Sequence, residues 1–170
     1  MIRLLSEDDV ESWLALRREA LLDAPLAFAT SPEDEFALDA QALREQLRRA
    51  PENVILGAFD EDLVGSVGLH RDRHRKAFHK AHVWGMYVTP SHRRRGLAAQ
   101  LMSAILEHAA ALPGISWVHL SVSSTAPEAR RLYDAIGFRP WGTEPEALRH
   151  AGRAASETHM ALPLDSGRAG

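Results

Sequence analysis

Residues 86–101 read MYVTPSHRRRGLAAQL, in which a predicted strand leads through three arginines and a glycine into a predicted helix. A helix N-terminus offers backbone N–H groups without intrahelical acceptors, together with the positive end of the helix dipole. Gly96 and Ala98 have little or no side chain, so a phosphate can approach the backbone there, and the arginines add positive charge. The segment therefore predicts an anion-binding site, with a solvated run of arginines as the alternative interpretation. It is not a P-loop, because the Gly-Lys-Ser/Thr ending is absent, and its single glycine does not fit the dinucleotide fingerprint.

Outward from this segment, hydrophobic spacing and turn residues predict the other strands and helices. We expect strands at residues 2–5, 54–59, 63–69, 81–88, 117–122, 138–142 and 158–164. We expect helices at about residues 7–22, 39–49, 96–112 and 127–136. This order predicts a single α/β (α+β) domain over residues 1–164, with a mixed central sheet of about six or seven strands, helices on both faces and a flexible tail at residues 165–170.

Two regions beside the central strands carry further signals. Gly65 and Gly68, in the second strand of a predicted hairpin, indicate a close backbone approach or a bulge. Residues 71–80 hold five basic residues and one acid, which predicts a solvated loop. His70 and His74 have a His-x-x-x-His spacing but no helix and no obvious carboxylate partner, so we expect no metal site.

Composition narrows the functional classes. The chain has 170 residues, a formal net charge of −3 and no cysteine. The charge is unlike that of a dedicated nucleic-acid-binding domain, and the lack of cysteine excludes disulfides, thiolate nucleophiles and cysteine-ligated metals. No apolar run approaches the roughly 18 residues of a membrane span, and the acids at residues 7–9 do not fit a signal peptide. We therefore expect a cytoplasmic protein with no membrane or nucleic-acid partner.

Two motifs in this chain resemble those of one enzyme family. Residues 93–98, RRRGLA, match the Arg/Gln-x-x-Gly-x-Gly/Ala motif of the GNAT (Gcn5-related) N-acetyltransferase superfamily. Residues 120–122, Ala129 and residues 132–138 resemble the strand, helix and "LY…GF" pattern of that family. The order of the predicted elements is also similar to the GNAT fold over most of the chain.

This resemblance implies a fold, a reaction and a cofactor site. Strands four and five would splay apart, with the pantetheine arm of acetyl-CoA between them. The protein would transfer the acetyl group of acetyl-CoA to a primary amine by direct attack within a ternary complex, without a metal. The residues implied to bind acetyl-CoA are Met86, Tyr87, Val88, Arg93, Arg94, Arg95, Gly96, Leu97, Ala98, Ala99, Ser124 and Tyr133.

The implied catalytic residues are Val88, Tyr133 and His82. A backbone N–H, that of Val88 or its neighbour, would polarise the thioester carbonyl, and Tyr133 would protonate the leaving thiolate. Many relatives carry a glutamate on the fourth strand as general base, but this strand holds no acid, so His82 is the substitute. A packing role for His82, with proton transfer to water, is the alternative. Ala126 replaces an asparagine found in many relatives, and Ser124 or its neighbours either substitute for it or cap the helix.

The acceptor side would come from residues 25–35 and 141–146. We expect Phe28, Glu33, Trp84 and Glu144 to bind the acceptor, since carboxylates attract a cationic amine and aromatic rings provide apolar walls. The alternatives are exposed turn acids and core aromatics. The acceptor would be a small-molecule or peptide amine. Members of the family often form homodimers, so the resemblance allows a homodimer for this chain too. A non-catalytic acyl-CoA-binding module is the competing function.

Overall fold

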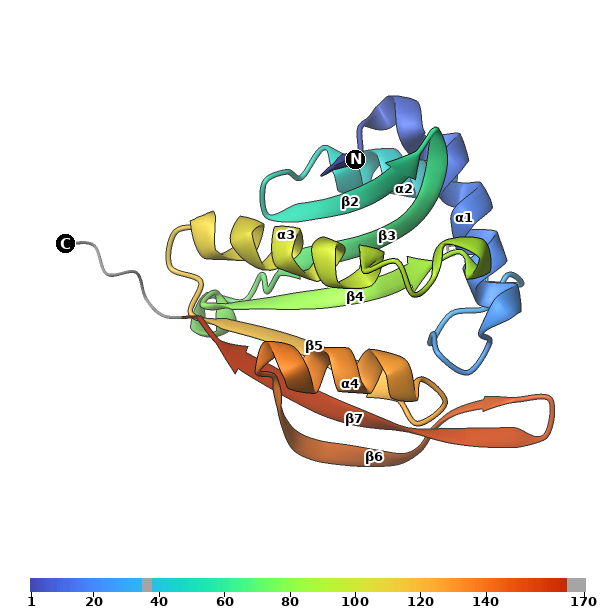
Figure 1. The fold of residues 1–170 in the computed structure, drawn as a ribbon. Coiled ribbons are helices and arrows are strands. Elements are labelled where there is room, and N and C mark those ends of the chain that lie inside the picture. Colours follow the sequence, from blue (N-terminus) through green and yellow to red (C-terminus); the bar gives the residue numbers. More distant parts are fainter. Residues whose placement is uncertain (35–37, 165–170) are drawn as a thin grey trace.

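Among the residues that the structure describes, seven strands form one mixed sheet in the order β1-β2-β3-β4-β5-β7-β6 (Figure 1). The computed structural model describes residues 1–34 and 38–164, so Glu35 of the expected acceptor segment and the expected tail lie outside the described residues. The strands are β1 Ile2–Leu4, β2 Asn53–Asp60, β3 Asp62–Arg71, β4 Lys80–Val88, β5 Trp117–Ser123, β6 Arg139–His150 and β7 Arg153–Pro163. All neighbouring strands are antiparallel except β4 and β5, which are parallel. The predicted mixed sheet is confirmed.

Four α-helices in the described part of the chain cover the two faces of this sheet. They are α1 Val10–Asp23, α2 Ala40–Leu47, α3 Leu97–Ala111 and α4 Pro127–Ile136. α3 and α4 lie on one face, and α1 and α2 lie on the other (Figure 1). The largest apolar cluster lies under α3 and α4, where Leu101, Ile105 and Phe138 are fully buried. Removing this apolar surface from water is the main stabilising contribution. No helix among the described residues is both long and apolar enough to cross a membrane.

The seam between β4 and β5 is short. Only residues 80–82 pair with residues 117–119. Beyond them β4 stays paired with β3, and β5 stays paired with β7 along its whole length. Each strand is therefore held on its outer side, and the two separate on their inner sides, so the expected splay of the fourth and fifth strands is confirmed.

A β-bulge interrupts β4 near the open end of this seam. Ser66 pairs with Tyr87 while Gly68 pairs with Trp84, so two residues of β4 face one residue of β3. Gly85 takes a positive φ of 64° at this point. The alternation of side chains is reset, and Met86 packs under α3 and α4 although Trp84 packs toward α1 and α2. The bulge expected in β3 is present next to Gly65, because Ala58 pairs with Gly65 and Phe59 with Leu63, which leaves Val64 as the extra residue; the bulge in β4 is a second one.

The hairpin of β6 and β7 is longer than the predicted strands. Residues 143–146 lie within β6, whereas the sequence predicts that they follow the strand. β6 is mostly exposed, and its register shifts between Glu144 and Leu148, so its sequence lacks the alternation of a half-buried strand. Cross-strand pairing with β7, which is not visible in the local sequence, extends the strand and carries the hairpin beyond the rest of the sheet (Figure 1).

Candidate functional site

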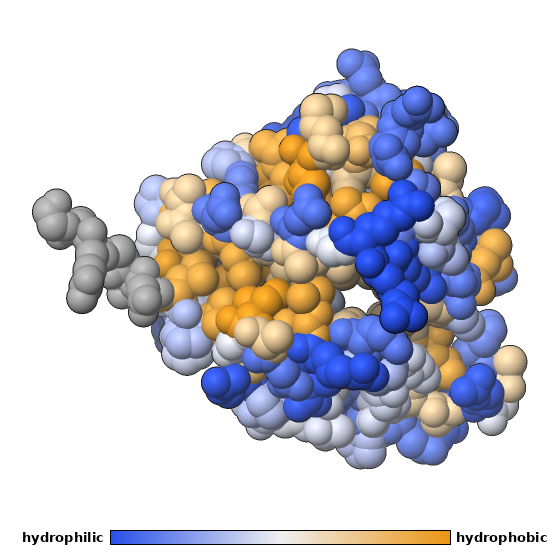
Figure 2. All heavy atoms as spheres, in the orientation of Figure 1, coloured by the Kyte–Doolittle hydropathy of each residue, from blue (hydrophilic) through white to orange (hydrophobic). Residues whose placement is uncertain are grey.

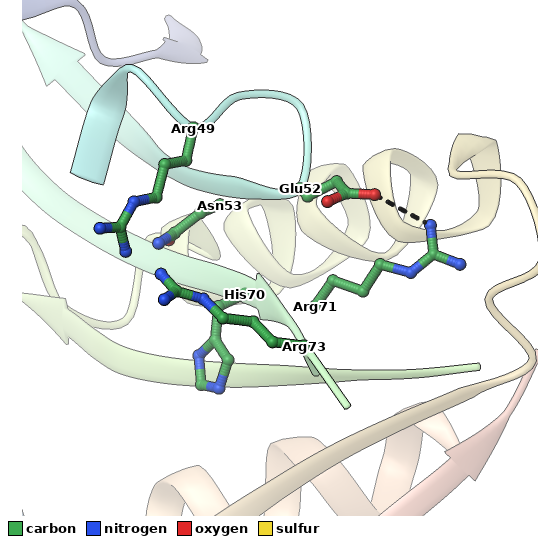
Figure 3. A pocket seen from close by; sticks show the side chains of 6 residues that line it. All are labelled: Arg49, Glu52, Asn53, His70, Arg71 and Arg73. Atoms are coloured by element: carbon green, nitrogen blue, oxygen red, sulfur yellow. Dashed lines mark hydrogen bonds and ion pairs between the residues drawn. The ribbon is translucent and has the colours of Figure 1, made fainter. Parts of the chain in front are cut away.

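One hollow of the described structure lies where β2 begins and β3 ends. It encloses about 370 Å³ and is lined by Arg49, Glu52, Asn53, His70, Arg71 and Arg73 (Figure 3). We call it the arginine hollow. Arg71 is directed away from Arg49 and Arg73 and pairs with Glu52 at 3.2 Å (Figure 3). No residue that the sequence marks as catalytic or cofactor-binding lines it.

Arg71 corrects the prediction that residues 71–80 form a solvated loop. Its side chain is only 6% exposed. Besides the ion pair with Glu52, it donates hydrogen bonds to the carbonyls of Phe78 at 2.7 Å and Pro113 at 2.9 Å. The guanidinium also lies 3.3 Å from the centre of the Phe78 ring. This arginine therefore ties together three chain segments as a structural group.

The second hollow lies in the splay, and we call it the β4–β5 cleft. It encloses about 80 Å³ and passes between the strands, because its lining comes from both faces of the sheet. The lining residues are Ala27, Phe28, Val83, Trp84, Gly85, Met86, Leu120, Ser121, Val122, Ser123, Ala126, Ala129 and Tyr133. Figure 2 shows an opening between the half of the molecule carrying α3 and the half carrying α4, with hydrophilic residues on its rim.

Tyr133 lies on the α4 side of the cleft. Its ring is 5% exposed and packs edge-on against Phe138, with the ring centres 6.0 Å apart. The hydroxyl oxygen forms no hydrogen bond to any described residue. Every fully buried side-chain nitrogen or oxygen of the described residues does have a partner, so this oxygen is not fully buried. The hydroxyl therefore reaches the open space of the cleft. Burial raises the pKa of Tyr133 to about 12, so the phenol is protonated at neutral pH.

Val88 ends β4 just beyond the cleft-lining residues Gly85 and Met86, and its backbone N–H faces away from β3. Thr89 N donates to Val64 O at 2.9 Å, which makes Val88 and Gly65 a non-hydrogen-bonded pair of the β3–β4 ladder. The N–H and C=O of Val88 consequently point away from β3. The carbonyl accepts a hydrogen bond from Arg93 Nε at 2.9 Å, and the N–H has no partner strand on its side of β4.

The start of α3 has the form that the sequence predicts for an anion site. The first hydrogen bond of the helix runs from Gln100 N to Gly96 O at 3.1 Å, so the three preceding N–H groups have no acceptor within the helix. Gly96 has a φ of 78°, a conformation that favours glycine. A Cβ built on Gly96 would approach only Gln100, at 3.9 Å. The backbone of residues 97–99 is thus accessible, and the cofactor role expected of Leu97, Ala98 and Ala99 stays a prediction.

The three arginines before this helix differ in their surroundings. Arg93 bonds the Val88 carbonyl and forms an ion pair with Asp23 of α1, so its side chain holds the end of β4. Arg94 has a positive φ of 61° and is exposed. Arg95 lies 3.8 Å from Asp60 and is also exposed. Of the three arginines, Arg94 is the one with no ion pair to a described residue, and the contact of Arg95 with Asp60 is long and exposed.

His82 lies at the closed end of the splay. Its imidazole is 3.5 Å from Asp72 and stacks on His70 with ring centres 4.9 Å apart. It does not line the cleft. Among the described residues, no three histidine, aspartate or glutamate side chains converge as a metal ion would need.

The residues just before α4 do not form the side-chain helix cap that was one of the two expectations for them. Ser124 Oγ accepts a hydrogen bond from Ser156 N at 3.2 Å, which ties it to β7. No side chain caps α4, so a capping role for the serines and threonine before it is wrong. Ser123, which is buried, lines the cleft instead.

The four expected acceptor residues fall into two groups. Phe28 and Trp84 line the cleft. Glu33 is exposed and away from the lining, and Glu144 lies on β6, 3.5 Å from His159. The aromatic pair is thus brought to the cleft, and the acidic pair is not.

Arg17 is a residue of this region that the sequence analysis does not identify. It lies on α1, donates a hydrogen bond to Thr30 Oγ1 at 2.9 Å and stands over the ring of Phe28. In the sequence it reads as part of the polar face of an amphipathic helix, next to Arg18. Only the packing of the loop after α1 against it sets it apart.

Comparisons with known proteins agree with this geometry. A model described as the acetyltransferase (GNAT) family matches residues 13–138. A mycothiol acetyltransferase of Brachybacterium faecium is 27% identical over 139 residues, which are 80% of this chain and 39% of that protein. The chain therefore spans about two fifths of the length of this relative.

Solved structures share the fold over nearly the whole chain. An acetyltransferase of the GNAT family from Streptococcus pneumoniae superposes with a TM-score of 0.85 at 15% identity, covering 96% of this chain and 99% of that one. The putative acetyltransferase yncA from Salmonella typhimurium, solved with acetyl-CoA, gives a TM-score of 0.84 at 20% identity, covering 100% and 96%. At these identities the likeness concerns the fold.

Proposed function

The chain belongs to the acetyltransferase (GNAT) family, and from that premise we propose that it is an acetyl-CoA-dependent N-acetyltransferase acting on a primary amine. One observation carries the proposal. Tyr133, whose hydroxyl has no partner among the described residues, lines the β4–β5 cleft, and the N–H of Val88 faces away from β3 at the end of the strand that forms the other side. We assign the N–H to the developing oxyanion and the hydroxyl to the leaving group.

The residues around the cleft fit acetyl-CoA in charge and in shape. We assign the pyrophosphate to the N–H groups of residues 97–99, with Arg94 and Arg95 adding positive charge. Arg93 would hold the carbonyl of Val88, so that the N–H of that residue keeps its direction. The inner edge of β4 at Met86 and Val88, which has no partner strand, would bind the pantetheine amides by strand-like hydrogen bonds. Tyr87 pairs with Ser66, so its backbone groups face β3, and any contact of Tyr87 with the cofactor would come from its side chain.

Acetyl-CoA supplies an acetyl thioester to the cleft. The Val88 N–H would donate to the thioester oxygen, where negative charge develops as the amine attacks. The amine nitrogen forms a bond to the carbonyl carbon, and the carbon–sulfur bond breaks. The phenol of Tyr133 gives its proton to the departing sulfur, and a proton released by the amine nitrogen restores the phenol through water.

The group that removes the proton from the amine is water in this proposal. His82 is the sequence-based candidate for a general base, but its ring is stacked on His70 and paired with Asp72 at the closed end of the seam. Val83, Gly85 and Met86 separate it from the attacking position along β4, and they line the cleft while His82 does not. A role for His82 in holding this end of the sheet fits its contacts better.

Calorimetric titration with acetyl-CoA tests the cofactor assignment, with CoA and ATP as controls. We expect acetyl-CoA to bind and ATP to bind much more weakly. A thiol-release assay with a panel of amines then tests the reaction. No acetyl-CoA binding would overturn the proposal, and binding without thiol release from any amine would favour a non-catalytic acyl-CoA-binding module. A cytoplasmic location and a homodimeric state stay predictions.

A further inference from the structure

We propose that the amine acceptor also carries a carboxylate, and that Arg17 binds this carboxylate at the α1 side of the β4–β5 cleft. The inference rests on the proposed function, because it names the acceptor class of that site. Its substrate would be a small amine of the amino-acid type. Three observations on Arg17 carry it: its position, its lack of a counter-ion and its free donors.

The guanidinium of Arg17 adjoins two residues that line the cleft. It stands 4.9 Å from the centre of the Phe28 ring. A Cβ built on Gly85, the bulged glycine of β4, would lie 3.7 Å from Arg17 Nη1. Both Phe28 and Gly85 line the cleft, and Gly85 is three residues from Val88. The positive charge is therefore at the edge of the space in which the acceptor must lie.

Arg17 forms no ion pair with any carboxylate in the described part of the chain. The two acids farther along α1 are engaged elsewhere, since Glu19 accepts a hydrogen bond from the Tyr87 hydroxyl at 3.0 Å and Asp23 pairs with Arg93. Arg71, the buried arginine of the other hollow, does have a carboxylate partner in Glu52. A partly buried charge without a partner is unfavourable, so a ligand anion is the natural complement.

Arg17 is charged and oriented for such a ligand. Burial lowers its pKa to about 10, which still leaves the guanidinium protonated at neutral pH. Thr30 accepts one of its hydrogen bonds, and the Phe28 ring supports its plane. The remaining N–H donors have no acceptor among the described residues. A planar fork with free parallel donors matches a carboxylate in two-point contact.

The test compares each standard amino acid with its decarboxylated amine as acceptor, for example L-phenylalanine with phenethylamine. Thiol release gives kcat and KM for both members of each pair. For the acetylated pairs we expect kcat/KM to favour the carboxylate member by roughly 10- to 100-fold, the range of a hydrogen bond to a charged group. The R17Q variant should lose this preference, mainly through a higher KM for the carboxylate member. The R18Q variant, at the exposed neighbour on α1, should keep it.

The outcomes separate this inference from the proposed function. Amine acetylation without a preference for carboxylates, or a preference retained in R17Q, overturns the inference and leaves the acetyltransferase assignment intact. Transfer to no carboxylate-bearing amine also overturns it. Absence of acetyl-CoA binding overturns both. Acetyl-CoA titration and thermal unfolding check that R17Q is folded. If it is not folded, the inference is judged from the preference of the wild-type protein for amino acids over their decarboxylated amines and from the same preference in the R17K variant.

Discussion

The arginine hollow and the β4–β5 cleft differ in how their polar groups are satisfied. The arginine hollow is the larger, at about 370 Å³ against about 80 Å³. Its buried arginine, Arg71, is bonded to Glu52 and to two backbone carbonyls. In the cleft the hydroxyl of the largely buried Tyr133 reaches the open space without a protein partner, and the Val88 N–H at the end of β4 faces away from β3. Unpaired polar groups on buried residues, rather than volume, distinguish the candidate site from the arginine hollow.

The physical reason is the cost of burying polar groups without partners. A buried donor or acceptor without a hydrogen bond destabilises the fold by about 1–3 kcal/mol. A polar network that is fully paired, as around Arg71, stabilises the chain by itself. Groups that wait for a ligand add stability only when the ligand is bound. Substitutions in the two hollows should therefore separate into losses of binding or turnover and losses of stability.

The largest effect is expected at the start of α3. The G96E substitution would place a carboxylate at the proposed pyrophosphate position and force a side chain into a positive φ. Two unit charges 4 Å apart repel by about 4 kcal/mol near a protein surface, which is a factor of about 10³ in affinity. Calorimetry should show acetyl-CoA binding reduced to that extent.

G152E is the matched control for this prediction. Gly152 also has a positive φ, 74°, but it lies in the turn between β6 and β7 with open space around it. The G152E substitution introduces the same charge and a similar backbone strain away from the cleft. Unchanged acetyl-CoA affinity in a folded G96E protein would remove the pyrophosphate assignment.

The next effect is expected at Tyr133. The Y133F variant keeps the ring packing against Phe138 and removes only the hydroxyl, which has no protein partner. We expect kcat to fall by about 10²- to 10⁴-fold, the usual contribution of a general acid, with little change in acetyl-CoA affinity. Thiol-release kinetics and calorimetry measure the two quantities. Equal turnover in Y133F and the wild type would exclude Tyr133 as the proton donor.

A smaller effect, of a different kind, is expected at Arg71. The R71A variant would leave the carbonyls of Phe78 and Pro113 without their donor. We expect the free energy of unfolding to fall by about 2–4 kcal/mol, with acetyl-CoA affinity unchanged. Urea unfolding followed by circular dichroism gives the first quantity. A loss of affinity in R71A at full stability would give the arginine hollow a functional role.

The smallest effect is expected at the exposed arginines of the same hollow. R49A and R73A remove charges that have no ion pair among the described residues. Stability should change by no more than about 0.5 kcal/mol, and kinetics should not change. They are the surface controls for R71A. A measurable change in kcat or KM in either variant would contradict the contrast between the two hollows.

Much of the fold could be predicted because its signals are local. Asp39 accepts hydrogen bonds from the first N–H groups of α2, as a residue before an apolar helix pattern should. Gly137, just past the end of α4, takes the positive φ that is common for a glycine after a helix. The hairpin of β2 and β3 turns at residues 60–62, between the two predicted strands. Caps, glycines and apolar spacing depend on neighbours within a few residues.

The parts that could not be predicted depend on distant partners. Arg71 looks solvated in a basic stretch, and it is buried because Pro113 and Glu52 come from other elements. The length of β6 follows from pairing with β7, and the β4 bulge from its register with β3. Arg17 reads as one of two adjacent surface arginines until the loop with Thr30 folds against it. The sequence motif was enough to name candidate site residues. It was not enough to predict what surrounds His82 and Glu144, because their neighbours come from other strands.

The short seam between β4 and β5 links affinity to stability. The chain joins its two half-sheets through residues 80–82 and 117–119, and it leaves the rest of both inner edges without a partner strand. A ligand that lies along β4 supplies hydrogen bonds that the sheet itself omits. Its binding energy then counts toward folding: at a concentration one hundred times its Kd, a ligand specific for the folded state adds about 2.7 kcal/mol to the free energy of unfolding. The supply of cofactor would thus set how long each molecule survives, as well as how fast it works.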